Sequence, residues 1–290
     1  MRQTFAVTRD IPALDEDKHQ LVSAPPTPRV GVVDYLRSLP FVIAFVSILV
    51  SFDVMQRLVL LFRGPEAFRR FTVYMNVCLI RSFSITGARL KIELSEEVDL
   101  KGPMIIISNH QSLMDIPLLY YVFGRMDLRF ISKRELGKWL PFVSFCLRNG
   151  GHTLIDRGSR RQAVEAIEKL GREMGENAFA VSVFPEGTRA RDGALKRFKV
   201  GGLEALRRQC PGVKVLPVAI DGLWEFARFK LMPVPSNLAL RVRVGEAFVP
   251  DEKSSSAQVM EQVYSCVADA LHEMRSEVSV DNRESREDGE

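Results

Sequence analysis

A histidine and an aspartate stand five residues apart, His110 and Asp115, directly after the apolar run Met104–Ser108. A short run of this kind is typical of a strand buried on both faces, and ligands bind at the carboxyl ends of such strands in open α/β sheets. Histidine is the usual side chain for taking a proton near neutral pH, and a carboxylate can fix its tautomer and stabilise the imidazolium. Because positions five apart are about 140° apart on an ideal helix, we expect His110 in the turn and Asp115 on the following helix.

Other interpretations of this segment stay open at this point. Ser112 and Asp115 have the spacing of a helix capping box, which would leave His110 as an ordinary loop histidine. A serine-hydrolase triad has little support, because the chain has no Gly-x-Ser-x-Gly segment. Cys146 is a weak candidate nucleophile, since its apolar neighbours would raise the pKa of the thiol.

A second segment, Phe184-Pro185-Glu186-Gly187-Thr188-Arg189, follows the apolar run Ala178–Phe184. Proline and glycine shape a tight loop, from which Glu186 and Arg189 would project. The planar guanidinium of arginine suits a phosphate, and a carboxylate can orient it. The alternative is a surface turn with an exposed ion pair of little energetic value.

Two further cations, Lys133 and Arg157, stand near predicted strand ends and could help to bind a phosphate. Taken alone, these two cations are better explained by a solvated charged face. The run Val215–Ile220 reads as a buried strand that could also line a channel for an acyl chain.

Taken together and in this order, these segments resemble the glycerolipid acyltransferase family, which includes the 1-acylglycerol-3-phosphate acyltransferases. The resemblance covers about residues 85–225. His110 and Asp115 resemble its His-x4-Asp motif, and Phe184–Arg189 resembles its Phe-Pro-Glu-Gly-Thr-Arg motif. The remaining similarities are an intermediate block from Lys133 to Arg157 and a final block at Leu216–Val218.

The resemblance implies that His110 is the general base and that Asp115 orients it. It implies further that the phosphate end of the acceptor is held by Glu186, Gly187, Thr188 and Arg189, with Lys133 and Arg157 as helpers. The implied reaction moves an acyl chain from acyl-CoA or acyl carrier protein to the free hydroxyl of 1-acylglycerol-3-phosphate and makes phosphatidic acid. It needs no metal or bound cofactor. Another lysolipid acceptor, a thioester hydrolase and a catalytically silent lipid-binding protein are the alternatives.

The elements expected to position these residues form an α/β fold, a mostly parallel buried sheet flanked by helices. We expect strands over Met104–Ser108, Leu128–Ser132, Ala178–Phe184 and Val215–Ile220, and a half-buried strand over 238–244. A helix capped by Ser159 should stop at Gly175, and a closing helix should run from Ser256 to Met274.

The chain divides into four predicted parts: a flexible leader over 1–38, a hydrophobic helical region over 39–84, an acyltransferase domain over 85–275 and a disordered tail over 276–290. The run Leu39–Phe52 is uncharged, and the whole stretch 39–62 is long enough to span, re-enter or lie on a membrane. Asp53, Gln56 and Arg57 share one helix face. A buried core helix is the alternative.

The charge pattern bears on location and partners. Four arginines that follow the run favour a cytoplasmic active site: Arg57, Arg63, Arg69 and Arg70. A net charge of +4 fits an anionic membrane or ligand. The aromatic residues do not alternate with basic ones in the way that would predict nucleic-acid binding. The predicted location is therefore a membrane.

Overall fold

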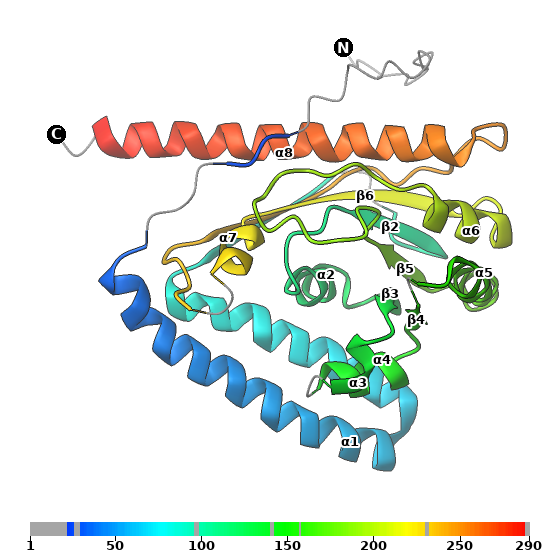
Figure 1. Ribbon diagram of the computed structural model, residues 1–290, viewed down its shortest axis with the longest axis horizontal. Coiled ribbons are helices and arrows are strands. Elements are labelled where there is room, and N and C mark those ends of the chain that lie inside the picture. The colour runs from blue at the N-terminus through cyan, green and yellow to red at the C-terminus, as the bar shows by residue number, and fades with distance from the viewer. Residues whose placement is uncertain are drawn as a thin grey trace.

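A seven-stranded sheet forms the centre of the computed structural model (Figure 1), which describes residues 22–25, 30–95, 99–139, 142–156, 158–229 and 232–287. The strand order is β1-β7-β6-β2-β5-β3-β4. The strands are β1 (Arg89–Leu94), β2 (Met104–Ser108), β3 (Leu128–Lys133), β4 (Thr153–Ile155), β5 (Ala180–Val183), β6 (Lys214–Asp221) and β7 (Ala239–Val244). Strands β6, β2, β5, β3 and β4 are parallel, whereas β7 is antiparallel to β6. This confirms the predicted mostly parallel α/β fold.

Helices cover both faces of the sheet. They are α1 (Val32–Ser82), α2 (Asp115–Phe123), α3 (Leu136–Trp139), α4 (Val143–Asn149), α5 (Arg160–Asn177), α6 (Gly201–Gln209), α7 (Leu223–Arg228) and α8 (Ser256–Glu287), with a 3₁₀ turn η1 (Phe83–Thr86) after α1. In Figure 1, α1 and α2 lie on one side of the sheet, and α8 crosses the other.

Alternate residues of β2 belong to two separate hydrophobic cores, one on each face of the sheet, because successive side chains of a strand point to opposite faces. Ile106 packs with the apolar side chains of α1 and α2, whereas Ile105 and Ile107 pack with those of α5, α6 and α8. All five residues of β2 are buried. The uninterrupted apolar run that predicted this strand therefore reflects its position between two helical layers.

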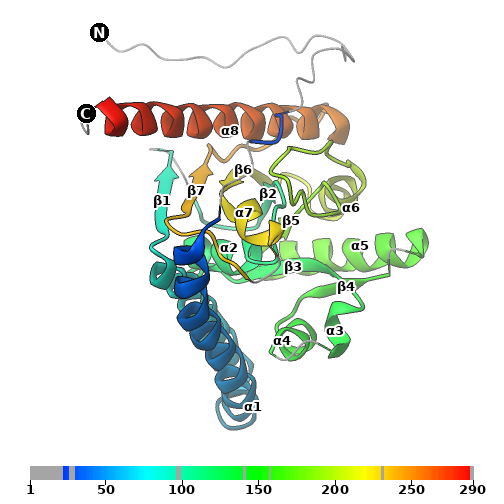
Figure 2. The same ribbon diagram turned by 60° about the vertical axis from the view of Figure 1, so that its left-hand side comes forward.

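Helix α1 is two arms joined at Gly64, whose backbone is left-handed (φ 79°). Pro65 begins the second arm, and proline is tolerated in the first turn of a helix. Figure 2 shows the two arms extending together away from the sheet. The second arm carries buried Phe68, Met75 and Leu79 into the core.

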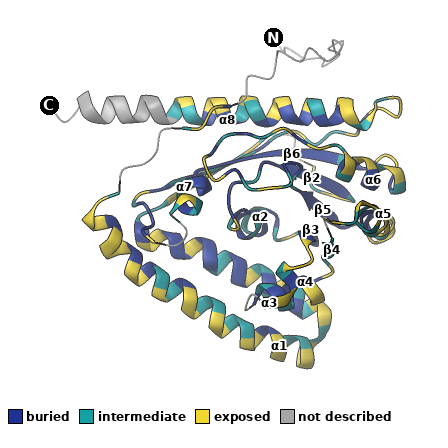
Figure 3. Cartoon of the chain, viewed as in Figure 1, coloured by how far each residue is buried: buried dark blue, intermediate teal, exposed yellow. Residues whose placement is uncertain are grey.

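The outward side of the first arm is exposed, as the yellow residues along it in Figure 3 show, and many of its exposed side chains are apolar. Its exposed side chains include Leu36, Leu39, Ile43, Val46, Val50, Val54, Leu58, Leu61 and Phe62. By length and composition alone, α1 contains a stretch sufficient to cross a membrane. An exposed apolar face of this size marks a surface for a membrane or another partner.

Asp53, Gln56 and Arg57 on the first arm do share one helix face, but that face packs against residues at the start of α4. Asp53 Oδ1 accepts the backbone N–H of Phe142 at 2.7 Å, and Gln56 Nε2 donates to the carbonyl of Phe142 at 3.2 Å. The guanidinium of Arg57 bonds Asp53 and lies 4.5 Å from the ring centroid of Phe145. These groups fix the first arm to the start of α4, opposite its apolar side.

Several predicted boundaries are wrong. Helix α1 begins at Val32, within the predicted leader, because Asp34 accepts the backbone N–H groups of Gly31 and Ser236. Earlier still, Val22 is buried, and its carbonyl accepts the N–H of Leu195. Residues 1–21 and 26–29 of the predicted leader lie outside the described residues.

Two helices also end later than predicted. Helix α5 continues past Gly175 to Asn177 and ends where Ala178 is left-handed (φ 52°). Gly175 lies inside the helix, where a Cβ would be at ordinary contact distance, 3.4 Å, from Cys210 Sγ. Helix α8 runs to Glu287 rather than Met274, and Glu277 within this extension pairs with Lys91 and Arg243 of the outer strands.

Candidate active site

The carboxyl ends of β2 and β5 bring the two predicted motifs together. His110 lies in the loop after β2, and Asp115 is the first residue of α2. His110 Nδ1 and Asp115 Oδ2 are 2.7 Å apart, with the histidine side chain 14% exposed and the aspartate fully buried. The pair therefore has the expected arrangement, with the histidine in the turn and the aspartate on the helix.

The hydrogen bonds of Asp115 determine which nitrogen of His110 carries a proton. Asp115 Oδ2 also accepts the backbone N–H groups of Gln111 at 2.6 Å and Ser112 at 2.9 Å. A carboxylate that accepts all three bonds requires Nδ1 of the imidazole to donate. The lone pair of a neutral His110 then lies on Nε2, where it can take a proton.

Only half of the predicted capping box is present, because the N–H of Asp115 bonds to the carbonyl of Ser112 and not to its hydroxyl. The half that is present uses the oxygen that binds the imidazole. Ser112 N–H donates to Asp115, while Ser112 Oγ accepts the N–H of Met114 at 3.2 Å. These bonds satisfy N–H groups at the start of α2, as a cap does. The aspartate thus holds the turn in shape and binds the imidazole simultaneously.

The loop of the second motif packs directly behind the histidine. Glu186 Oε1 accepts the backbone N–H of His110 at 2.8 Å, and the carbonyl of His110 accepts the N–H of Ala190 at 2.7 Å. The ring of Phe184 stacks on the imidazole with centroids 4.2 Å apart. Residues from two loops 76 positions apart in the chain therefore set the backbone and ring of His110.

Glu186 is not the partner of Arg189 that the sequence suggested. Its side chain is turned inward to His110, and no ion pair joins it to Arg189 among the residues that the structure describes. Burial raises the pKa of Glu186 to about 8, although the N–H of His110 opposes the shift. Near neutral pH this carboxyl group is largely protonated, so its contribution is a hydrogen bond to the backbone.

Arg189 is half-buried beside the His–Asp pair. Burial lowers the pKa of its guanidinium, nearby Arg191 lowers it further, and Asp115 opposes both. This interaction with Asp115 means that Arg189 contributes positive charge near the imidazole. Thr188 is exposed, and Gly187 adopts the left-handed backbone (φ 71°) that the tight loop needs.

Two lysines that the sequence analysis missed border this loop. Lys196 Nζ donates to the carbonyl of Arg189 at 2.7 Å and to Thr188 Oγ1 at 3.3 Å. A Cβ on Gly187 would lie 3.2 Å from Lys199 Nζ. The sequence did hold a signal for them, since both lysines follow the motif within about ten residues. The chain after the motif folds back on it, and this brings Lys196 and Lys199 beside residues 187–189.

Of the two cations predicted to help bind the phosphate, the structure describes only Lys133. Lys133 ends β3, the strand beside β5, and its half-exposed ammonium group is 3.6 Å from Glu135. It lies at the same edge of the sheet as His110, but within the described part of the chain no hydrogen bond or ion pair joins the two side chains. Arg157 lies outside the described residues. Within the described residues, no cluster of three His, Cys, Asp or Glu side chains is placed to hold a metal ion.

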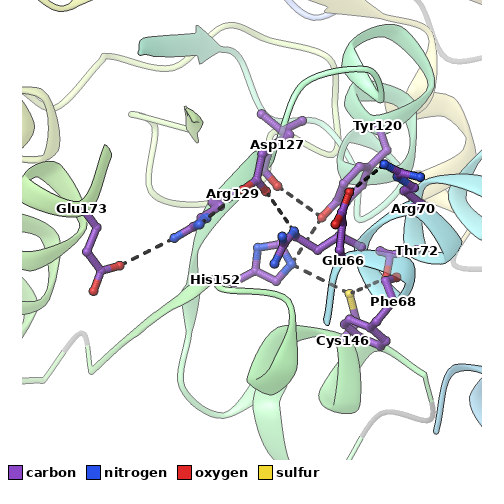
Figure 4. A network of polar contacts seen from close by, with 12 residues as sticks. Glu66, Phe68, Arg70, Thr72, Tyr120, Asp127, Arg129, Cys146, His152 and Glu173 are labelled. Atoms are coloured by element: carbon purple, nitrogen blue, oxygen red, sulfur yellow. Dashed lines mark hydrogen bonds and ion pairs between the residues drawn. The ribbon is translucent and has the colours of Figure 1, made fainter. Parts of the chain in front are cut away.

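A second histidine network, shown in Figure 4, lacks this chemistry. His152 Nδ1 accepts the backbone N–H of Phe130 at 3.2 Å, and its Nε2 lies 3.2 Å from the hydroxyl of Tyr120. Burial and nearby Arg129 lower the pKa of His152 to about 4, so it is neutral at ordinary pH. Burial raises the pKa of Cys146 to about 12, which confirms that it is a poor nucleophile.

Comparison with known proteins shows which family and which fold this chain resembles. A model of the family described as "Acyltransferase" matches residues 89–221, the stretch that holds both motifs. A solved structure, the 1-acyl-sn-glycerophosphate (LPA) acyltransferase PlsC from Thermotoga maritima, is similar with a TM-score of 0.68 and 29% identity, over 83% of this chain and 96% of that one. The chain belongs to the acyltransferase family.

Curated acyltransferases are similar over part of the chain. The 1-acyl-sn-glycerol-3-phosphate acyltransferase beta of Homo sapiens is 31% identical over 64% of this chain and 66% of its own length. The enzyme of that name from Cocos nucifera is 29% identical over 66% of this chain and 62% of its own, and that from Borreliella burgdorferi is 28% identical over 69% and 76%. The match to the Limnanthes douglasii relative spans 53% of that protein.

Proposed function

We propose that this acyltransferase transfers a fatty acyl chain from acyl-CoA or acyl carrier protein to the free hydroxyl of 1-acylglycerol-3-phosphate and so makes phosphatidic acid. The observation that carries the proposal is the 2.7 Å contact of His110 with Asp115, next to the loop that carries Arg189, whose charge interacts with Asp115. The names of the relatives support the acceptor.

In the proposed mechanism, His110 Nε2 takes the proton of the acceptor hydroxyl as its oxygen attacks the thioester carbonyl. Asp115 keeps the other proton on Nδ1 and stabilises the imidazolium. When the tetrahedral intermediate collapses, the carbon–sulfur bond breaks and the thiolate leaves with the proton from His110. No acyl-enzyme forms.

The acceptor's phosphate is assigned to the cations around the motif loop. Arg189 offers a planar fork for two phosphate oxygens, with the backbone of Gly187 and the hydroxyl of Thr188 beside it. Glu186 supports the site from behind, through His110. Lys133, on the next strand, and Arg157 are further candidates for the same phosphate.

Membrane association is part of the proposal, because the acceptor and the product are lipids. The exposed apolar side of the first arm of α1 supports it. We assign the site to the cytoplasmic side on the strength of the arginines that follow the apolar run.

The test is an acyl-transfer assay of the purified protein in phospholipid vesicles, with acyl-CoA or acyl carrier protein and a panel of lysolipids. Phosphatidic acid should be the main product. A different acylated lysolipid would change the acceptor, and release of free fatty acid would indicate a hydrolase. Lipid binding without either reaction would indicate a catalytically silent protein.

A further inference from the structure

Two adjoining hollows lie at the elbow of α1, and they differ in chemistry. The first, of about 290 Å³ and called the polar hollow below, has a wall that is about half polar and includes Arg69, Arg70, Arg125, Tyr120 and His152. The second, of about 660 Å³, lies between the two arms and has a more apolar lining. Both include Glu66 and Arg70 in their lining, so the two hollows adjoin at this pair.

The polar hollow has an excess of positive charge at its mouth. Of its acidic groups, Glu66 is 2.6 Å from Arg70, and Asp127 is 3.9 Å from Arg69 and 3.2 Å from Arg129. Figure 4 shows these pairs around Tyr120 and His152. This leaves Arg125, which is exposed, as the cation of the lining without a pair among the described residues. Because His152 is neutral, it adds no charge to the inner wall.

The apolar hollow adjoins exposed side chains at the elbow of α1. Val59, Ala67 and Phe71 contribute to its lining, while Arg63 borders it on the first arm. Beside it, Leu61 and Phe62 are each 74% exposed, and Tyr74 is 60% exposed. Exposed tyrosine beside arginine is typical of the headgroup level of a membrane.

We propose that this elbow, defined by the two hollows, binds one anionic diacyl phospholipid of the membrane. Its headgroup lies among Arg69, Arg70 and Arg125, with Arg63 beside it at the border of the second hollow, and an acyl chain follows the groove of Val59 and Phe71. Charge complementarity and continuity with the exposed apolar face favour a lipid over a protein partner. The inference rests on the membrane association in the proposed function, but not on catalysis.

This elbow is separate from the candidate active site. Asp115 begins α2, whereas Tyr120 and Gly124, which line the polar hollow, lie toward and beyond its other end. A nine-residue helix is about 14 Å long. Leu128 at the amino end of β3 also lines the hollow, whereas His110 follows the carboxyl end of β2. A lipid at the elbow would not occupy the acceptor's position.

The test is photolabelling of the full chain in phosphatidylcholine vesicles. One sample contains phosphatidylglycerol with a photoreactive group in one acyl chain, and the other contains the equivalent phosphatidylcholine. Mass spectrometry then locates the label. We expect the anionic probe to label peptides within 59–74 and 120–128 preferentially. Phosphatidylglycerol is suitable because it is neither the acceptor nor the product proposed above.

Charge variants make the test specific. Arg63→Gln with Arg125→Gln should lower elbow labelling on the order of tenfold to thirtyfold, since two cations near an anionic surface are removed. Arg160→Gln with Arg161→Gln, on exposed α5, should leave it unchanged. Equal labelling by the two probes, an unaffected elbow double variant, or displacement by inorganic phosphate at matched ionic strength would overturn the proposal. Elbow labelling without acyl transfer would reject only the proposed function.

Discussion

Glu186 accepts the backbone N–H of His110 at 2.8 Å while its other carboxyl oxygen is buried with no hydrogen-bond partner among the described residues. The glutamate of one motif therefore supports the histidine of the other from behind. This relationship explains why the two motifs act as one unit, although they leave different strands of the sheet. It also makes the ionisation of Glu186 a source of pH dependence.

Glu186→Gln should become relatively more stable than the wild type as the pH rises from about 5 to 8. The folded carboxyl keeps its proton to about pH 8, whereas the unfolded chain releases it near the ordinary value of 4.5. Within this window the folded state binds more protons, so the wild-type free energy of unfolding falls with rising pH. Glutamine keeps an acceptor for His110 N–H but has no such titration.

Thermal melts of both proteins across this pH range measure the effect. Glu176→Gln, on the exposed end of α5, is the matched control and should show no such trend. A difference in Tm between Glu186→Gln and the wild type that stays constant with pH would contradict the buried, protonated state.

Arg189→Lys should raise the KM for the phosphate-bearing acceptor and affect the thioester donor less. Lysine keeps the charge but loses the two-pronged geometry. Loss of one charge-assisted hydrogen bond predicts roughly tenfold to hundredfold weaker acceptor binding. Steady-state kinetics with each substrate varied, beside a melting curve, checks this. Because Arg189 does not pair with Glu186, the Tm should change little; a clear fall in Tm with an unchanged acceptor KM would make Arg189 a structural residue.

Asp53→Ala should destabilise the protein by about 1–3 kcal/mol, because it leaves the N–H of buried Phe142 without its acceptor. Glu66→Ala removes only an exposed pair with Arg70, and a loss of about 0–1 kcal/mol is expected. Denaturant unfolding in detergent compares the two variants. Equal effects would mean that the contact of Asp53 with Phe142 does not hold the first arm in place.

Replacing Ile43, Val50 and Leu58 together by glutamate should release the protein from membranes without lowering its Tm. All three side chains are exposed on the outward face of α1. Charged groups are costly in the apolar part of a bilayer, and we expect at least about a tenfold fall in the membrane-bound fraction. Vesicle sedimentation measures it. Leu94→Glu, an exposed change on β1, is the control, and equal binding by the triple variant would place the membrane elsewhere.

The sequence predicted the local parts of this structure well, because the pattern that signals them lies within a few residues. Met104–Ser108 is apolar at every position, and the structure has strand β2 there with all positions buried. His110 and Asp115 lie in one turn, so their contact could be anticipated. The family and fold class are confirmed by the comparisons.

Contacts between distant segments were not predicted from the sequence. No local pattern shows that Glu186 turns to His110 rather than to Arg189, or that Asp53 faces Phe142 rather than lipid. The end of α8 was missed for the same reason. Its charged residues resemble a solvated tail, yet Arg275 pairs with Asp221 at 2.8 Å, beside the candidate active site. The roles assigned to the site residues stay predictions.

Acyl transfer from acyl-CoA to 1-acylglycerol-3-phosphate by His110→Ala tests the central claim most directly. The wild type should make phosphatidic acid, and the variant should lose about 10²–10⁴ in rate while it keeps its melting temperature. Asp115→Asn should lose nearly as much, because the tautomer of His110 is then wrong. His272→Ala, an exposed histidine on α8, should keep full activity. Near-wild-type turnover by folded His110→Ala would contradict the assignment of His110 as the base.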